Sequence, residues 1–255
     1  MTELVVLSLA SLFAGFVDAI GGGGGLVLVP ALFGVFPGAA PATLFGTNKA
    51  ASVWGTGWAT WQYASRVQMP WASLWPVALA ALVGSGAGAW CVTVADPTVL
   101  RQALPFVLLV VLIYTLVRRN LGRVHAPRYQ GRTQAAVASA IAFILGVYDG
   151  FFGPGTGSFL VFLFVRWLGF DFLHASASAK LLNTVTNASA LLLFAYKGHV
   201  WWHLAALMAV ANVIGSLIGT RMALRHGAPF VRAVFVCVVA LLIVKTAWDG
   251  YFKAA

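Results

Sequence analysis

Long apolar runs, separated by short polar or glycine-rich stretches, fill this chain from one end to the other. No charged side chain occurs between Arg66 and Asp96. The same is true from Lys180 to Lys197 and from there to Arg221. A helix needs about 20 apolar residues to cross a bilayer, and these runs lack the alternating segments of a transmembrane β-barrel. The pattern predicts an all-α, polytopic membrane protein.

Each half of the chain contains five apolar segments. They cover about residues 3–18, 25–37, 43–65, 71–95 and 99–117 in the first half, and 133–148, 155–168, 174–196, 200–220 and 231–248 in the second. The first two segments of each half are short and flank a glycine-rich turn, so they form either short spans or a re-entrant hairpin. With about three full spans added per half, we expect a helical bundle of about eight to ten membrane segments.

A single constant shift, which places Gly15 on Gly146, aligns the chain with itself without a gap. The other aligned pairs include Asp18 with Asp149, Lys49 with Lys180, Trp71 with Trp202, Gly84-Ser85 with Gly215-Ser216, Gly88 with Gly219 and Arg101 with Arg232. An apolar bias would match Leu, Val and Ala, but not rare residues at one constant offset. The alignment indicates two homologous halves. We expect a first transmembrane repeat at 1–118, a linker at 119–131 and a second repeat at 132–255.

The number of segments and the positions of the arginines bear on how the two halves are oriented. An odd number of segments per half makes the repeats inverted, whereas counting each short pair as one broken span makes them parallel. The join RRNLGRVHAPRYQGR, residues 118–132, has five arginines and no acid, which is typical of a cytoplasmic loop. The inverted arrangement places more of the arginines on that side, so we expect inverted repeats, a common transporter architecture.

Composition supports the membrane assignment and excludes other classes. The chain of 255 residues is 61% hydrophobic and 9% charged, against about 25% charged in soluble domains. Positive loops explain the net charge of +10, so we expect no nucleic-acid partner. Cys91 and Cys237 lie in apolar runs and are interpreted as small hydrophobic residues. No motif for a metal or another cofactor is present, and we expect none.

Two glycine-rich turns, Gly21–Gly25 and Gly153–Ser158, are candidate anion sites. Glycine allows a sharp turn and a close approach of a ligand to the backbone. The helix after each turn begins with N–H groups that have no partner in the helix and can bind an anion. The candidate substrate-binding residues here are Gly22, Gly23, Gly24, Gly155, Thr156 and Gly157. The alternative is a tight hairpin or close helix packing through small residues.

Lys49 and Lys180 follow Asp18 and Asp149, respectively, at the same spacing, and each begins a long apolar segment. A lysine within the membrane is costly and is a candidate functional residue. Polar residues at helical spacing extend both lysines into stripes: Lys49, Ser52 and Thr56 with the adjacent Asn48, and Lys180, Asn183, Thr184 and Asn187. Their ammonium, amide and hydroxyl donors suit an oxyanion. Alternatively, each lysine neutralises a nearby aspartate or extends to the membrane surface.

Asp18 and Asp149 end the first segment of each half. A structural role is favoured, in which the carboxylate accepts hydrogen bonds from the glycine turn or pairs with Lys49 or Lys180. The alternative is coupling to protons by a buried carboxylate. A negative charge within the site would repel an anion, which argues against direct contact of these aspartates with the substrate.

These same stretches resemble the TauE/SafE sulfite-exporter family, also called the TSUP family. The resemblance rests on GFVDAIGGGGGLVLVPAL followed by GTNKA in the first half. In the second half it rests on GVYDGFFGPGTGSFLVF followed by ASASAKLLNTVTN, and it covers nearly the whole chain. It implies a multi-pass permease of the bacterial inner membrane, often an exporter, for a sulfur-containing anion such as sulfite or an organosulfonate, for example sulfoacetate.

The predicted function is therefore transport of a small anion across the lipid bilayer, not enzymatic catalysis. A passive anion channel remains an alternative. An intramembrane aspartyl protease, with Asp18 and Asp149 sharing a proton, is less consistent with the sequence, because no GxGD motif is present and the repeat explains both aspartates. The substrate, the direction of transport, coupling to protons or sodium, and a homo-oligomeric state are left open.

Overall fold

The predicted all-α architecture is confirmed by the computed structural model, which describes residues 2–69, 71–100, 126–226 and a few positions between 102 and 110. Every regular element in these ranges is helical. The elements are α1 (Thr2–Gly21), α2 (Gly25–Val35), α3 (Pro41–Ala64), α4 (Trp71–Val94), α6 (Gly131–Phe151), α7 (Thr156–Leu163), the π-helix η1 (Phe164–Leu168), α8 (Phe172–Tyr196) and the helix Trp202–His226.

The helix boundaries follow local sequence signals. Pro41 occupies the first turn of α3, where its missing N–H costs nothing. Gly155, with φ of 81°, precedes α7 in a left-handed conformation that a side chain would disfavour. Asp171 caps α8 by accepting a hydrogen bond from the backbone N–H of His174 at 2.9 Å. In the ranges that the structure describes, each predicted segment contains the start of a helix or lies within two residues of it, but the helix Trp202–His226 extends beyond the predicted end at residue 220.

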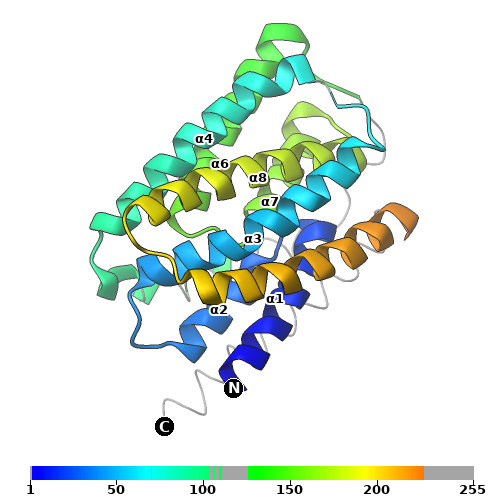
Figure 1. Ribbon diagram of the computed structural model, residues 1–255. Coiled ribbons are helices and arrows are strands. Elements are labelled where there is room, and N and C mark those ends of the chain that lie inside the picture. Colours follow the sequence, from blue (N-terminus) through cyan, green and yellow to red (C-terminus); the bar gives the residue numbers. More distant parts are fainter. Residues whose placement is uncertain are drawn as a thin grey trace.

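Two long helices, α3 and α8, cross the middle of the molecule, as Figure 1 shows. On one side α4 packs along α6. On the other side α1 packs against the helix Trp202–His226, where Ser11 donates a hydrogen bond to the Met208 carbonyl at 2.7 Å. A helix from one predicted half thus packs on a helix from the other half at both places.

Glycines allow these helices to approach closely. A Cβ added at Gly84 would overlap the Phe143 carbonyl of α6, and one added at Gly215 would overlap the Leu12 carbonyl of α1. The shift that aligns the two halves places Gly84 on Gly215 and Leu12 on Phe143. The two contacts are therefore equivalent under the sequence repeat, and at both of them a small residue lets two helices pack closely.

Two serines beside these glycines make equivalent hydrogen bonds. Ser85 of α4 donates to the Thr186 carbonyl of α8 at 2.7 Å. Ser216 donates to the Gly55 carbonyl of α3, also at 2.7 Å. The same shift relates both the donors and the acceptors of these two bonds. Each central helix is thus attached by the same bond to an outer helix of the other half.

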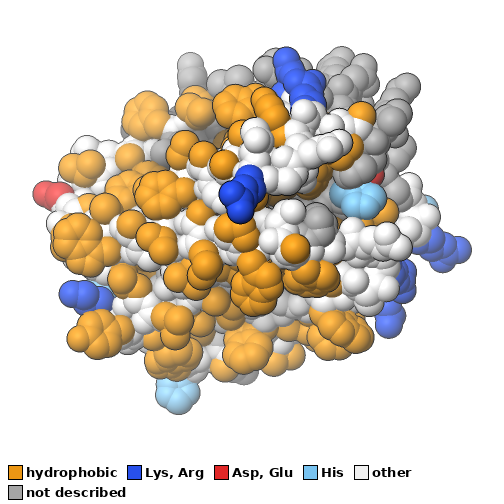
Figure 2. All heavy atoms as spheres, turned by 90° about the horizontal axis from the view of Figure 1, so that it is seen from above, with side chains coloured by type: hydrophobic (Ala, Val, Ile, Leu, Met, Phe, Trp, Pro, Cys, Tyr) orange, Lys and Arg blue, Asp and Glu red, His pale blue; other side chains and the backbone are white. Residues whose placement is uncertain are grey.

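Hydrophobic side chains fill most of the interior and also cover much of the surface, while a set of polar side chains is buried between the helices. Within the part of the chain that the structure describes, four helices are long and apolar enough to span a membrane: Thr2–Gly21, Trp71–Val94, Gly131–Phe151 and Trp202–His226. Figure 2 shows a face covered mainly by hydrophobic side chains. Trp54 and Trp61 of α3 are 64% and 63% exposed, so they belong to the surface. The helices α3 and α8 are as long, but their polar residues are largely buried.

Several sequence predictions fall outside the described residues. They concern most of segments 99–117 and 119–131, all of segment 231–248, and the residues Arg101, Arg232 and Cys237. The opposite orientation of the two halves in the membrane and the domain boundaries stay predictions.

Candidate functional site

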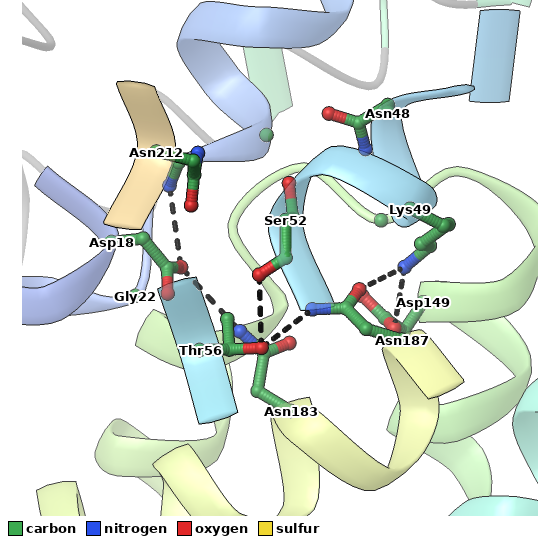
Figure 3. Close-up of a pocket in the computed structure, with 13 residues that line it drawn as sticks. Asp18, Gly22, Asn48, Lys49, Ser52, Thr56, Asp149, Asn183, Asn187 and Asn212 are labelled. Atoms are coloured by element: carbon green, nitrogen blue, oxygen red, sulfur yellow. Dashed lines mark hydrogen bonds and ion pairs between the residues drawn. The ribbon is translucent and has the colours of Figure 1, made fainter. Parts of the chain in front are cut away.

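A small polar cavity lies where the central helices meet the two glycine turns (Figure 3). It encloses about 20 Å³ that the centre of a water molecule can reach. The helices α1, α3, α6, α8 and Trp202–His226 and both turns contribute to its wall. The lining residues are Asp18, Gly22, Gly24, Gly25, Asn48, Lys49, Ser52, Thr56, Asp149, Gly153, Asn183, Asn187 and Asn212.

Lys49 and Asp149 form a buried ion pair at one side of this cavity. The Lys49 ammonium lies 2.6 Å from Asp149 Oδ2, and the two side chains are 3% and 2% exposed. Lys49 also donates a hydrogen bond to Asn187 Oδ1 at 3.0 Å. Figure 3 shows these three side chains pointing toward one another. The pairing compensates two charges that would otherwise be very costly to bury.

Lys180 and Asp18 form a second ion pair. The Lys180 ammonium lies 3.3 Å from Asp18 Oδ2 and also donates to the main-chain carbonyl of Asp18. Asp18 Oδ1 accepts further bonds from the Gly24 backbone N–H at 3.5 Å and from Asn183 Nδ2 at 3.4 Å. The Asp18 carboxylate therefore interacts with a lysine, an amide side chain and the glycine turn together.

The two ion pairs connect the halves crosswise. Lys49 of the first half binds Asp149 of the second, and Lys180 of the second half binds Asp18 of the first. Both lysines thus neutralise an aspartate, which is the structural alternative that the sequence left open. The pairing also separates Asp18 from Asp149 chemically, because each carboxylate has its own ammonium partner. This arrangement does not resemble two carboxylates that share a proton.

The glycines of the two turns allow backbone conformations and close backbone contacts that other residues would not allow. Gly22 and Gly153, equivalent in the repeat, have φ of 80° and 85°, a left-handed conformation that favours glycine. A Cβ added at Gly22 would overlap the backbone at Gly157. The two turns therefore pack on each other, and the N–H of Gly24 is directed to Asp18.

The predicted binding residues divide into two groups. Those that line the cavity are Lys49, Asn48, Ser52, Asn183, Asn187, Gly22 and Gly24, together with Asp18 and Asp149. Those that do not line it are Lys180, Gly23, Gly155, Thr156 and Gly157. The sequence suggested two equivalent half-sites, whereas the cavity lies beside Lys49 and draws its glycines mainly from the first turn.

Asn212 is a cavity residue that the sequence reasoning missed. It is 2% exposed, and its amide donates to the Ser11 carbonyl at 3.1 Å. The equivalent position in the first half is Ala81, so the comparison of the halves gives no signal there. Asn212 lies in an apolar run without charged residues. That position alone could have indicated a functional residue, because polar groups inside a membrane need partners.

The cavity offers binding groups of both signs. Its rim and walls carry the charges of Lys49, Asp149 and Asp18, with Lys180 directly behind Asp18. Among the described residues, no group of three or more His, Cys, Asp or Glu side chains could hold a metal ion. Asn48 Oδ1 is buried there without a hydrogen-bond partner in the described part of the chain. Such an atom is normally satisfied by water or a ligand.

Apolar helices of membrane-spanning length around a small polar cavity indicate a multi-pass membrane transporter. The family described as "Sulfite exporter TauE/SafE" matches residues 7–246, and the chain belongs to this family. This confirms the resemblance found in the sequence and the expectation that the protein is a transporter of the bacterial inner membrane, not an enzyme.

Similar chains from bacteria carry matching names. "Probable membrane transporter protein ORF9" from Sinorhizobium sp. is 35% identical, covering 96% of this chain and 93% of the relative. "Probable membrane transporter protein YfcA" from Escherichia coli K12 is 36% identical, covering 97% and 91%. A "Probable membrane transporter protein" from Haemophilus influenzae is 31% identical, covering 98% and 96%. No solved structure matches this chain.

Proposed function

We propose that this protein exports a small sulfur-containing anion, such as sulfite or an organosulfonate like sulfoacetate, and binds it in the cavity beside Lys49. The main support for this proposal is the buried Lys49 ammonium, which lines a polar cavity between the helices. An ammonium surrounded by amide and hydroxyl groups provides the donors that an oxyanion accepts. Membership of the TauE/SafE family supports the sulfur chemistry.

Two further observations support ligand binding at this place. The Ser52 side chain lines the cavity, and its hydroxyl can rotate to donate to a bound anion. Asn48, one residue before Lys49, has the buried oxygen without a partner among the described residues. Because a buried unsatisfied polar atom is costly, a ligand or its bound water that supplies a hydrogen-bond donor to this oxygen gains affinity.

Uptake into proteoliposomes tests this function. Purified wild-type protein is assayed with radiolabelled sulfite, sulfoacetate, thiosulfate and sulfate, beside Lys49→Ala and empty liposomes. We expect saturable uptake of at least one of these anions, and loss of that uptake in Lys49→Ala. Wild-type protein that moves none of the four anions would contradict the proposed substrate class.

Counterflow separates a carrier from a passive channel. Liposomes loaded with unlabelled anion accumulate labelled anion transiently if a carrier exchanges the two. A channel shows no such overshoot and no saturation. We expect counterflow, because the cavity is small and every charged group in its wall is paired.

A further inference from the structure

The two ion pairs are equivalent in sequence but not in their surroundings. Asp18 Oδ1 accepts from Gly24 N and Asn183 Nδ2 in addition to the bond between Oδ2 and Lys180. Within the described residues, Lys49 is the one donor whose hydrogen bond reaches the Asp149 carboxylate. Within the described part of the chain, the charge of Asp149 is therefore compensated by Lys49 alone, whereas the charge of Asp18 has several independent partners.

The lysines differ in the same way. Lys180 donates to the main-chain carbonyl of Asp18 as well as to its carboxylate, near the C-terminal end of α1 where cations are favoured. Lys49 bonds only to the side chains of Asp149 and Asn187 among the described residues. Of the two lysines, Lys49 alone lines the cavity. The Lys49 ammonium can thus leave the Asp149 carboxylate and bind another anion without breaking a hydrogen bond to a main-chain carbonyl.

An anion that takes the place of Asp149 beside Lys49 leaves that carboxylate buried without a donor. The Asp149 side chain is buried, and an unpaired carboxylate in such a place binds a proton instead of remaining charged. We propose that Asp149 takes up one proton when the anion binds Lys49, so that the protein moves a proton together with each anion. This inference rests on the proposed function, and it assigns the coupling to Asp149 and not to Asp18.

Few other charged groups face Asp149. Lys49 approaches it from α3, while Asp18 and its partner Lys180 belong to the other pair, from α1 and α8. Tyr148 precedes it on α6 and donates its hydroxyl to the Pro154 carbonyl at 2.6 Å. The helix α4, packed along α6, and the short α7 have no charged residue. The proton balance of the site therefore depends on the anion, Lys49 and Asp149.

The charge balance of the step is simple. Before binding, the ammonium of Lys49 and the carboxylate of Asp149 cancel. After binding, the ammonium cancels one charge of the anion, and the proton neutralises the carboxylate. The proton comes from the aqueous side that supplies the anion, and both leave on the opposite side. A singly charged anion then crosses without net charge.

The test measures proton movement per transported anion. Proteoliposomes containing a pH-sensitive dye are given each anion of the panel, with the sodium salt compared with the choline salt. We expect internal acidification with anion uptake, equal in both salts. Anion uptake without acidification, or uptake that requires sodium, would overturn the inference while leaving the proposed function intact. Wild-type protein that takes up no anion overturns both.

Matched variants locate the proton. In Asp149→Asn we expect acidification to disappear for anions that carry no titrating proton, and any remaining uptake to follow an imposed membrane potential. In Asp149→Glu, which keeps a carboxylate, acidification returns. In Asp18→Asn the rate falls, but the ratio of protons to anions stays at the wild-type value. Asp149→Asn with the wild-type ratio, or Asp18→Asn without proton movement, would overturn the assignment. If Asp149→Asn does not fold, the Asp18→Asn ratio decides.

Sulfite itself titrates near neutral pH, so its own proton also acidifies the liposomes. Thiosulfate and sulfate carry no titrating proton at that pH. Where sulfite is the anion transported, the comparison of Asp149→Asn with wild type separates the two protons. A coupled proton on Asp149 is lost in the variant, whereas a proton carried by sulfite is not.

Discussion

Asn187 of α8 donates a hydrogen bond to Thr56 Oγ1 of α3 at 3.5 Å, and the two residues are 131 positions apart. They are therefore equivalent residues of the two halves, in direct contact with each other. Equivalent residues meet only near the axis of a two-fold arrangement. The crossed ion pairs Lys49–Asp149 and Lys180–Asp18 obey the same relation. The cavity thus lies beside the place where equivalent residues of the two halves meet.

Breaking the buried pair on one side only should destabilise the protein strongly. Lys49→Ala leaves Asp149 uncompensated, and Asp149→Ala does the same to Lys49. We expect each to lower the free energy of unfolding by about 3–5 kcal/mol. The double variant removes both charges and should cost less than either single variant. Chemical unfolding in detergent measures all three, and a double variant that costs the sum of the single ones contradicts the pairing.

The glycine contacts between helices predict a second effect on stability. Gly84→Ala and Gly215→Ala would each force a methyl group into a backbone carbonyl of the neighbouring helix. We expect each to cost about 1–3 kcal/mol, as overpacking does. Gly34→Ala is the control, since nothing lies within 4 Å of an added Cβ there. Thermal unfolding in detergent should show lower midpoints for the first two variants and no loss for the control.

Ser85 and Ser216 should contribute equally. Each hydroxyl donates at 2.7 Å to a carbonyl of a central helix, so Ser85→Ala and Ser216→Ala should each cost about 0.5–1.5 kcal/mol. Thr93, half-buried and bonded within its own helix to the Trp90 carbonyl, provides the control Thr93→Ala with an effect below about 0.5 kcal/mol. A clear cost for one serine and none for the other would contradict the equivalence of the two contacts.

The amino-acid sequence predicted the helices and the repeat better than the site. Apolar periodicity and punctuation by Gly and Pro are local, so the order of residues is enough to place the segments. Which lysine meets which aspartate depends on how the halves pack, and the spacing allowed Lys49 to pair with either Asp18 or Asp149. The sequence also did not predict that the two ion pairs have different surroundings. Gly24 and Asn183 cause the difference by donating hydrogen bonds to Asp18, and these contacts exist only in the folded chain.

The cap of α8 predicts a dependence of stability on pH. Burial raises the pKa of the Asp171 carboxyl, but hydrogen bonds from the backbone and ring of His174, the latter at 2.5 Å, outweigh it and hold that pKa below its ordinary value. A carboxyl with a lowered pKa in the folded state stabilises the protein above the pKa of the unfolded chain, about 3.9. This stabilisation is lost as the pH falls through the folded value.

Two variants separate the cap from the charge. Asp171→Ala should cost about 0.5–2 kcal/mol at neutral pH, because the first turn of α8 loses its acceptor. Asp171→Asn keeps a capping oxygen but does not titrate. The difference in melting temperature between wild type and Asp171→Asn should therefore be largest at neutral pH and shrink in acid, because only the wild-type residue loses its charge. A difference that grows on acidification would show that the ionised carboxylate does not stabilise this helix.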